Sequence, residues 1–121
     1  MTAHHGRVVL ERTFTQEDFD RFAALSGDDN PIHTDPAFAE RTRFGRTVAH
    51  GLLLSGVLRS LVEQLAPGRS LAEQNLMFPA PTFTGEPMRF SAEQDSAGIR
   101  LEVRRVSDQV ITCSGDCRLC P

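Results

Sequence analysis

The chain of 121 residues contains no lysine, no tyrosine and no tryptophan, so all 13 of its basic residues are arginines. Without lysine the chain has no Schiff-base nucleophile, no anchor for pyridoxal phosphate and no phosphate-loop lysine. Without tyrosine it has no catalytic phenol. These absences exclude several large classes of enzyme before any motif is considered.

No apolar run reaches the roughly 18 residues that a membrane-spanning helix needs. The first residues, Met-Thr-Ala-His-His-Gly, lack the pattern of a secretory signal peptide, and we expect His4 and His5 to lie in a frayed terminus. The net charge of −3 gives no bulk attraction for nucleic acid or for an anionic membrane. We therefore expect a cytoplasmic protein that binds neither.

Cysteine is scarce, and Cys113, Cys117 and Cys120 all lie near the C-terminus. An odd number of cysteines argues against a disulfide framework and fits a reducing compartment. A zinc site would need a fourth ligand, and none lies nearby in the sequence. The odd positions of residues 111–119 are apolar or small and the even ones mostly polar, which predicts a strand with Cys113 and Cys117 on its core face.

The length of the chain suits one hydrophobic core, so we expect residues 1–121 to form a single domain. Residues 7–13 can form a first strand, and Thr15 can cap a helix that ends at the Ser-Gly pair before a turn-rich segment over 26–35. Asp35 can then cap a second, short helix, because a proline follows at the favoured first helical position.

Residues 51–65 are the most apolar stretch of the chain, and their leucines and valines nearly surround a helical wheel. This segment predicts a helix that is buried on most sides. Downstream the periodicity becomes that of strands, over 76–83, 88–93, 99–106 and 110–119, and two prolines place the first of these at a sheet edge or a bulge. Helices followed by an antiparallel sheet predict an α+β fold in which the sheet covers the apolar helix.

Two separated motifs carry the chemistry. Residues 26–33 read Ser-Gly-Asp-Asp-Asn-Pro-Ile-His, and His50-Gly51 stands at the start of the predicted central helix. In these motifs the sequence resembles the MaoC-like, (R)-specific 2-enoyl-CoA hydratase family, whose pattern is Ser-Gly-Asp-x-Asn-Pro-x-His followed by His-Gly. The Pro-Thr-Phe-Thr-Gly-Glu run at 81–86 extends the resemblance over nearly the whole chain. It implies a single hot-dog fold, an antiparallel sheet wrapped around a long central helix.

The resemblance implies a reversible hydration in fatty acid metabolism, from trans-2-enoyl-CoA to (R)-3-hydroxyacyl-CoA, with no cofactor and no metal. It implies that Asp28 takes the proton of water, while His33 orients the water and supplies the α-proton. Gly51 has no side chain and begins a helix, so its N–H can reach the thioester oxygen. Asn30 and His50 are predicted beside the substrate, Asn30 holding the loop by backbone hydrogen bonds and His50 packing at the helix start.

The resemblance also implies a homodimer or a higher homo-oligomer, with a substrate tunnel at the interface. Arginines near its mouth would meet the CoA phosphates, and the candidates are Arg41, Arg43, Arg46, Arg104 and Arg105. Two alternatives stay open, namely a dehydratase of 3-hydroxyacyl chains on an acyl carrier protein and a non-catalytic subunit that binds acyl thioesters.

Two features depart from this simple interpretation. Some relatives carry a small hydroxyl residue about two turns into the central helix, where this chain has Arg59. A charged side chain in an apolar helix must be paired or reach solvent. Asp28, His33, Asp35 and His50 can also be drawn as a metal cluster, although the family uses no metal and we expect none here.

Overall fold

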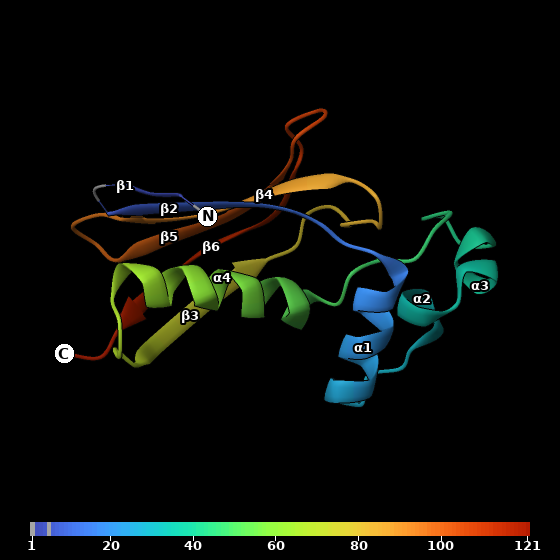
Figure 1. Ribbon diagram of the computed structural model, residues 1–121, viewed down its shortest axis with the longest axis horizontal. Helices are drawn as coiled ribbons and strands as arrows, with labels where there is room; N and C mark the ends of the chain where they lie inside the picture. The colour runs from blue at the N-terminus through green and yellow to red at the C-terminus, as the bar shows by residue number, and fades with distance from the viewer. Residues whose placement is uncertain (1, 5) are drawn as a thin grey trace.

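The computed structural model describes residues 2–4 and 6–121, with side chains described from residue 6 onward (Figure 1). The helices are α1 (Gln16–Ser26), α2 (Pro31–Thr34), α3 (Pro36–Glu40) and α4 (Gly51–Leu65). The strands are β1 (Thr2–His4), β2 (Arg7–Thr13), β3 (Leu71–Met77), β4 (Pro87–Gln94), β5 (Ile99–Arg105) and β6 (Ile111–Leu119). The frayed terminus predicted for His4 is wrong, because His4 pairs with Arg7 in β2; His5 lies outside the described residues.

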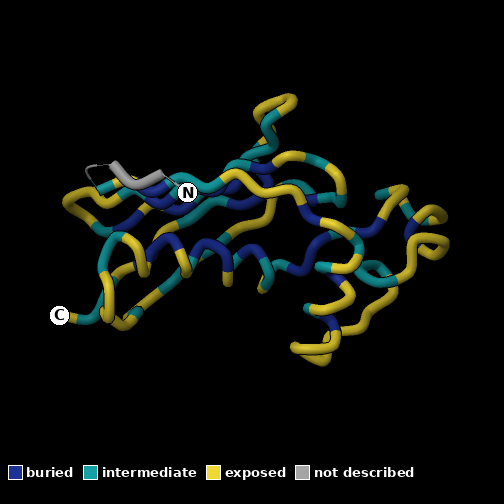
Figure 2. The backbone as a smooth tube through the Cα atoms, in the orientation of Figure 1, coloured by how far each residue is buried: buried dark blue, intermediate teal, exposed yellow. Residues whose placement is uncertain are grey.

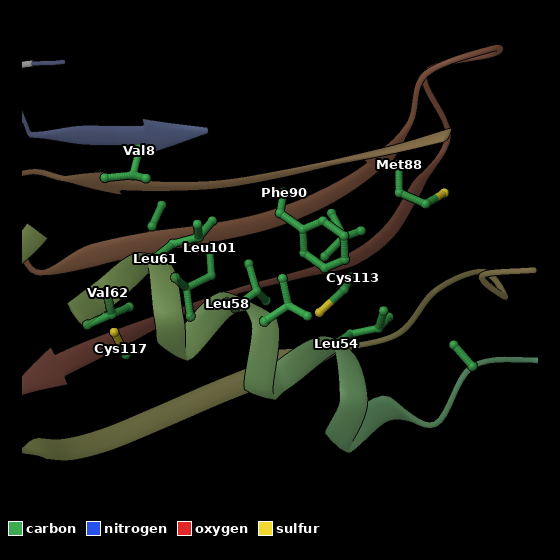
Figure 3. Close-up of a cluster of buried hydrophobic side chains, with 14 of the residues drawn as sticks. Val8, Leu54, Leu58, Leu61, Val62, Met88, Phe90, Leu101, Cys113 and Cys117 are labelled. Atoms are coloured by element: carbon green, nitrogen blue, oxygen red, sulfur yellow. The ribbon is translucent and has the colours of Figure 1, made fainter. Parts of the chain in front are cut away.

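The strands form one antiparallel sheet in the order β1-β2-β4-β5-β6-β3, and α4 lies against one of its faces (Figure 1). Figure 3 shows the core between them. The helix contributes Leu54, Val57, Leu58, Leu61 and Val62, and alternate positions of β4 and β5 contribute Met88, Phe90, Ala92, Ile99, Leu101 and Val103. This arrangement confirms the α+β prediction and the single solvated face of the sheet.

Cys113 and Cys117 are fully buried on the core face of β6, as the alternation predicted. Burial raises the pKa of the Cys113 thiol to about 11, because removal from water disfavours the thiolate. Both thiols therefore behave as small apolar side chains of the core. No helix in the described part of the chain is long and apolar enough to cross a membrane.

Helix α4 has the predicted bounds, and most of its residues are buried or half-buried (Figure 2), although Leu52 is 72% exposed. The strand prediction that follows it is wrong in detail. The strand predicted over 76–83 lies earlier, because β3 ends at Met77. Prolines 79 and 81 cannot donate ladder hydrogen bonds, and only an isolated bridge joins Phe83 to Val48. Strand β3 pairs with β6 and is an edge of the sheet.

Helices α1 to α3 lie beyond one end of α4 (Figure 1). Thr15 caps α1 by accepting a hydrogen bond from the Asp18 N–H, and Gly27 ends the helix with a left-handed φ of 81°. Asp35 caps α3 as predicted. The segment predicted as a turn-rich loop contains a single helical turn, α2, because proline suits its first position.

Candidate active site

Asp28 and His33 meet in the segment between α1 and α2. The turn at Gly27 places Asp28 just outside α1, and the Asn30 side chain starts α2 by accepting a hydrogen bond of 3.1 Å from the Ile32 N–H. The single turn of α2 returns His33 toward the carboxylate, and 3.8 Å separates its Nε2 from the Asp28 Oδ2. The structure therefore brings the predicted pair together, and Asn30 holds the loop by backbone hydrogen bonds as expected.

The tautomer of His33 is fixed by the backbone. Its Nδ1 lies 2.7 Å from the carbonyl oxygen of Val48. A carbonyl oxygen can only accept, so Nδ1 carries a proton and donates it. Every further exchange of a proton by this ring must therefore take place at Nε2, which faces Asp28. The His33 side chain is 15% exposed and that of Asp28 is 57% exposed, so water reaches the carboxylate.

His50 lies directly against His33, with ring centroids 3.8 Å apart and planes at 22°. Its Nε2 donates a hydrogen bond of 2.9 Å to the backbone carbonyl oxygen of Asp28. Burial lowers the pKa of His50, the bond to Asp28 partly opposes this, and the neighbouring His33 lowers it further. His50 is thus held neutral, and it packs at the helix start against Phe22 as predicted.

A cavity of about 420 Å³ opens beside this pair, a volume typical of small-molecule sites. Its apolar walls come from Phe22, Leu52, Leu76 and Phe78. Its polar lining includes Asp28, His33 and His50 near the loop and two residues that the sequence did not reveal, Ser55 and Gln74. These two come from α4 and β3, and no local motif relates positions that are brought together only by the fold.

Gly51 lies where this cavity adjoins a second one of about 400 Å³. It is the first residue of α4, so its N–H has no partner within the helix. Among the described residues the His50 side chain makes no capping hydrogen bond. A Cβ added to Gly51 would lie 3.0 Å from the ring of Phe78, which lines both cavities. Glycine therefore permits this close packing, and its N–H makes no hydrogen bond within the part of the chain that the structure describes.

Three of the five candidate arginines form ion pairs with carboxylates of the same chain. Arg46 pairs with Glu86, Arg105 pairs with Glu86 and Asp108, and Arg104 pairs with Glu102. Arg41 and Arg43 form no ion pair with any residue that the structure describes. Of these two, only Arg43 lines the second cavity.

Arg59 is accommodated away from the Asp28–His33 pair. It donates a hydrogen bond of 2.9 Å to the carbonyl oxygen of Arg69 and lies 3.6 Å from the Glu63 carboxylate. Both partners belong to the C-terminal end of α4 and the turn that follows it. The charge in the apolar helix is therefore paired, on a half-buried side chain. The hydroxyl that lines the cavity is that of Ser55, one turn into the helix.

Asp28, His33 and His50 offer potential metal-ligand atoms within 4.8 Å of one another. Asp35, the fourth member of the possible cluster, is instead the cap of α3. The two imidazoles are stacked with their planes at 22°, so their lone pairs lie in two nearly parallel planes, an arrangement that does not favour tetrahedral coordination of one ion. We keep the expectation that the site holds no metal.

An antiparallel sheet packed on one central helix defines a hot-dog fold, and an Asp–His pair lies beside the N-terminus of that helix. The family model described as "MaoC like domain" matches residues 2–113, and the chain belongs to this family. Both the fold and the family predicted from the sequence are confirmed.

Named relatives agree with this assignment. An (R)-specific enoyl-CoA hydratase of Aeromonas caviae is 33% identical over 88% of this chain and 81% of the relative. A 3-hydroxybutyryl-CoA dehydratase of Methylorubrum extorquens is 32% identical over 88% of this chain and 67% of the relative. The solved structure of an (R)-hydratase from A. caviae involved in PHA biosynthesis superposes with a TM-score of 0.82 at 28% identity, covering 96% of this chain and 95% of that one.

The lowered pKa of His50 predicts a pH-dependent stability. The unfolded chain takes up a proton near the ordinary pKa of 6.5, whereas folded His50 resists protonation until the pH is lower. The unfolded state then binds more protons, so the free energy of unfolding falls as the pH falls through about 6.5. His50→Gln keeps an N–H donor without titrating. Its melting temperature should fall less between about pH 7.5 and 5.5 than that of the wild type; equal losses would contradict the assignment.

Proposed function

We propose that the chain is a hydratase that adds water to a trans-2-enoyl thioester and gives the (R)-3-hydroxyacyl product, with the reverse dehydration at the same site. The observation that carries the proposal is the Asp28 carboxylate 3.8 Å from His33 Nε2, in an apolar cavity that also exposes the start of α4. The hydratase and dehydratase relatives support it. Residues 1–121 would act as one domain, and the cytoplasmic location stays a prediction.

The two side chains have complementary roles in the proposed reaction. Asp28 accepts a proton from water as the oxygen attacks the β-carbon, and the electron pair of the double bond moves toward the thioester oxygen. His33 then delivers a proton from Nε2 to the α-carbon. Because Nδ1–H is committed to Val48, His33 must begin as the imidazolium, with Asp28 as its counter-ion. Transfer of the water proton from Asp28 to His33 restores the starting state, so the protons balance.

Gly51 would stabilise the charge that develops on the thioester oxygen. Its N–H begins α4 and adjoins the cavity, and a helix N-terminus carries partial positive charge. A fixed donor aimed at a developing oxyanion is among the largest contributions to such reactions. His50 would act beside it by holding the Asp28 backbone and remaining neutral, so that the positive charge stays on His33.

The second cavity would take the phosphopantetheine arm of the substrate. It meets the first cavity at Gly51 and Phe78, so a thioester bound at Gly51 can extend into both. Arg43 at this cavity lacks a carboxylate partner within the described chain, and it would face a phosphate. CoA and acyl carrier proteins share this arm. A mitochondrial 3-hydroxyacyl-[acyl-carrier-protein] dehydratase of Arabidopsis thaliana is 34% identical over 67% of this chain and 49% of the relative. A carrier-bound substrate is thus the alternative.

A homodimer would complete the site. Strand β3 is an edge of the sheet. Large apolar side chains are exposed on it and at the cavity, since Met77 of β3 is 69% exposed and Leu52, which lines the cavity, is 72% exposed. Unpaired edges and exposed apolar surface are the features that two-fold association covers. We therefore propose that two copies join through their β3 edges.

We expect Asp28→Asn and His33→Gln each to lower the turnover of crotonyl-CoA by at least about a hundredfold, because each removes one proton-transfer group. Circular dichroism should be unchanged, since both changes are nearly isosteric. Asp29→Asn is the matched control, because the neighbouring carboxylate does not line the cavity. Wild-type rates in both folded variants would refute the assignment.

Gly51→Pro deletes the proposed oxyanion donor, while Gly51→Ala keeps it. Both add a Cβ against Phe78, which is 47% exposed and able to yield. Proline suits a first helical position, and the His50 ψ of 137° is what the residue before proline prefers. We expect turnover in the proline variant to be roughly a hundredfold below that of the alanine variant at a similar melting temperature. Equal turnover would make Gly51 a packing residue only.

Arg43→Gln should raise the KM for crotonyl-CoA by roughly tenfold through the loss of one phosphate contact. The KM for the N-acetylcysteamine thioester, which has no phosphate, should change little, and Arg41→Gln serves as the control. An equal rise in KM for both thioesters would show that Arg43 shapes the cavity without contacting the phosphate.

Light scattering at micromolar concentration should give the mass of a dimer. Met77→Glu places a charge on the proposed interface and should shift the protein to monomers with reduced turnover. An active wild-type monomer would rule out a site that depends on the partner.

A further inference from the structure

The cavity beside Asp28 and His33 contains a second polar group that the proposed chemistry does not use. Gln74 of β3 and Ser55 of α4 both line it, and the Gln74 Nε2 donates a hydrogen bond of 2.9 Å to the Ser55 Oγ. The strand register places Gln74 opposite Cys117, whose side chain is in the core. The Gln74–Ser55 pair is thus held between the sheet and the helix.

This pair has hydrogen-bonding capacity left over. The Gln74 Oε1 is buried without a hydrogen-bond partner among the described residues. The Ser55 hydroxyl accepts the bond from Gln74 and donates none that the structure describes. Turning the amide over exchanges its oxygen and nitrogen, but Ser55 can still satisfy only one of them. One unused acceptor and one unused donor are the complement of a ligand hydroxyl group, which both donates and accepts.

The position of Ser55 along α4 determines how far from the thioester such a ligand hydroxyl would have to lie. Ser55 follows Gly51 by four residues and lies on the same helix face. At about 1.5 Å per residue the two are roughly 6 Å apart along the axis. An extended chain advances about 1.2 Å per bond, so roughly five bonds would join a thioester carbonyl at Gly51 to a group at Ser55.

We propose that the Gln74–Ser55 pair is a subsite for a hydroxyl group carried by the acyl chain about five bonds from the thioester carbonyl, an inference that rests on the proposed hydratase function. A hydroxyl placed there would give the buried Gln74 Oε1 its missing partner. A plain alkyl chain of that length would leave this oxygen unpaired, and an unsatisfied buried polar group is costly. A crotonyl chain ends before the pair and leaves room for water. The pair determines which chains are accepted and takes no part in proton transfer.

The test compares 2-hexenoyl-CoA with its ω-hydroxy derivative. The wild type should favour the hydroxylated chain by at least about tenfold in kcat/KM. Gln74→Met removes the polar atoms of the side chain at nearly the same size. It should reduce the preference to about threefold or less, and such a loss would be due to polarity because the size is unchanged. Ser60→Ala is the matched control, because the Ser60 hydroxyl bonds to the Val57 carbonyl of its own helix; this variant should keep the wild-type preference.

Calorimetric binding of hexanoyl-CoA and ω-hydroxyhexanoyl-CoA, which are not hydrated, separates this subsite from the reaction. Tighter binding of the hydroxylated chain by a protein that hydrates neither enoyl thioester would support the subsite and refute the hydratase. Equal binding and equal turnover of the two chains by the wild type overturn the subsite without touching the hydratase. A preference that survives in folded Gln74→Met also overturns it.

Discussion

The hydrogen bond from His33 Nδ1 to the Val48 carbonyl oxygen is the constraint on which the site depends. It joins α2 to the segment that leads into α4, and a second bond, from the Val48 N–H to the Ile32 carbonyl oxygen, fixes the same two segments. Val48 also bridges to Phe83. The His33 ring is thereby oriented by the backbone of three separate segments, and only Nε2 is left to face Asp28.

The two stacked histidines have different roles. His50 donates its Nε2–H to the Asp28 carbonyl oxygen, and its pKa is lowered mainly by burial and further by the neighbouring His33. A neutral ring stacked on His33 does not repel an imidazolium as a second charged ring would. The loop that carries Asp28 is thus tied to the start of α4, so that Asp28, His33 and the N–H of Gly51 keep one geometry.

The sequence predicted those parts whose signal is local. Caps such as Thr15 and Asp35, the apolar run of α4 and the alternation of β5 depend on neighbours in the chain, and they are confirmed. Strand β3 was misplaced because its residues alternate poorly and its pairing with β6 includes a register shift near Leu71. Gln74 and Ser55 could not be predicted, since a hydrogen bond between residues far apart in sequence has no local pattern.

The most direct test of the central claim is hydration by the unmodified protein. Purified protein is incubated with crotonyl-CoA, the loss of enoyl absorbance is followed, and the product is resolved by chiral chromatography. The Asp28–His33 geometry and the family predict steady turnover to (R)-3-hydroxybutyryl-CoA. A folded protein that leaves the enoyl absorbance unchanged, or that releases the (S) product, would contradict the account.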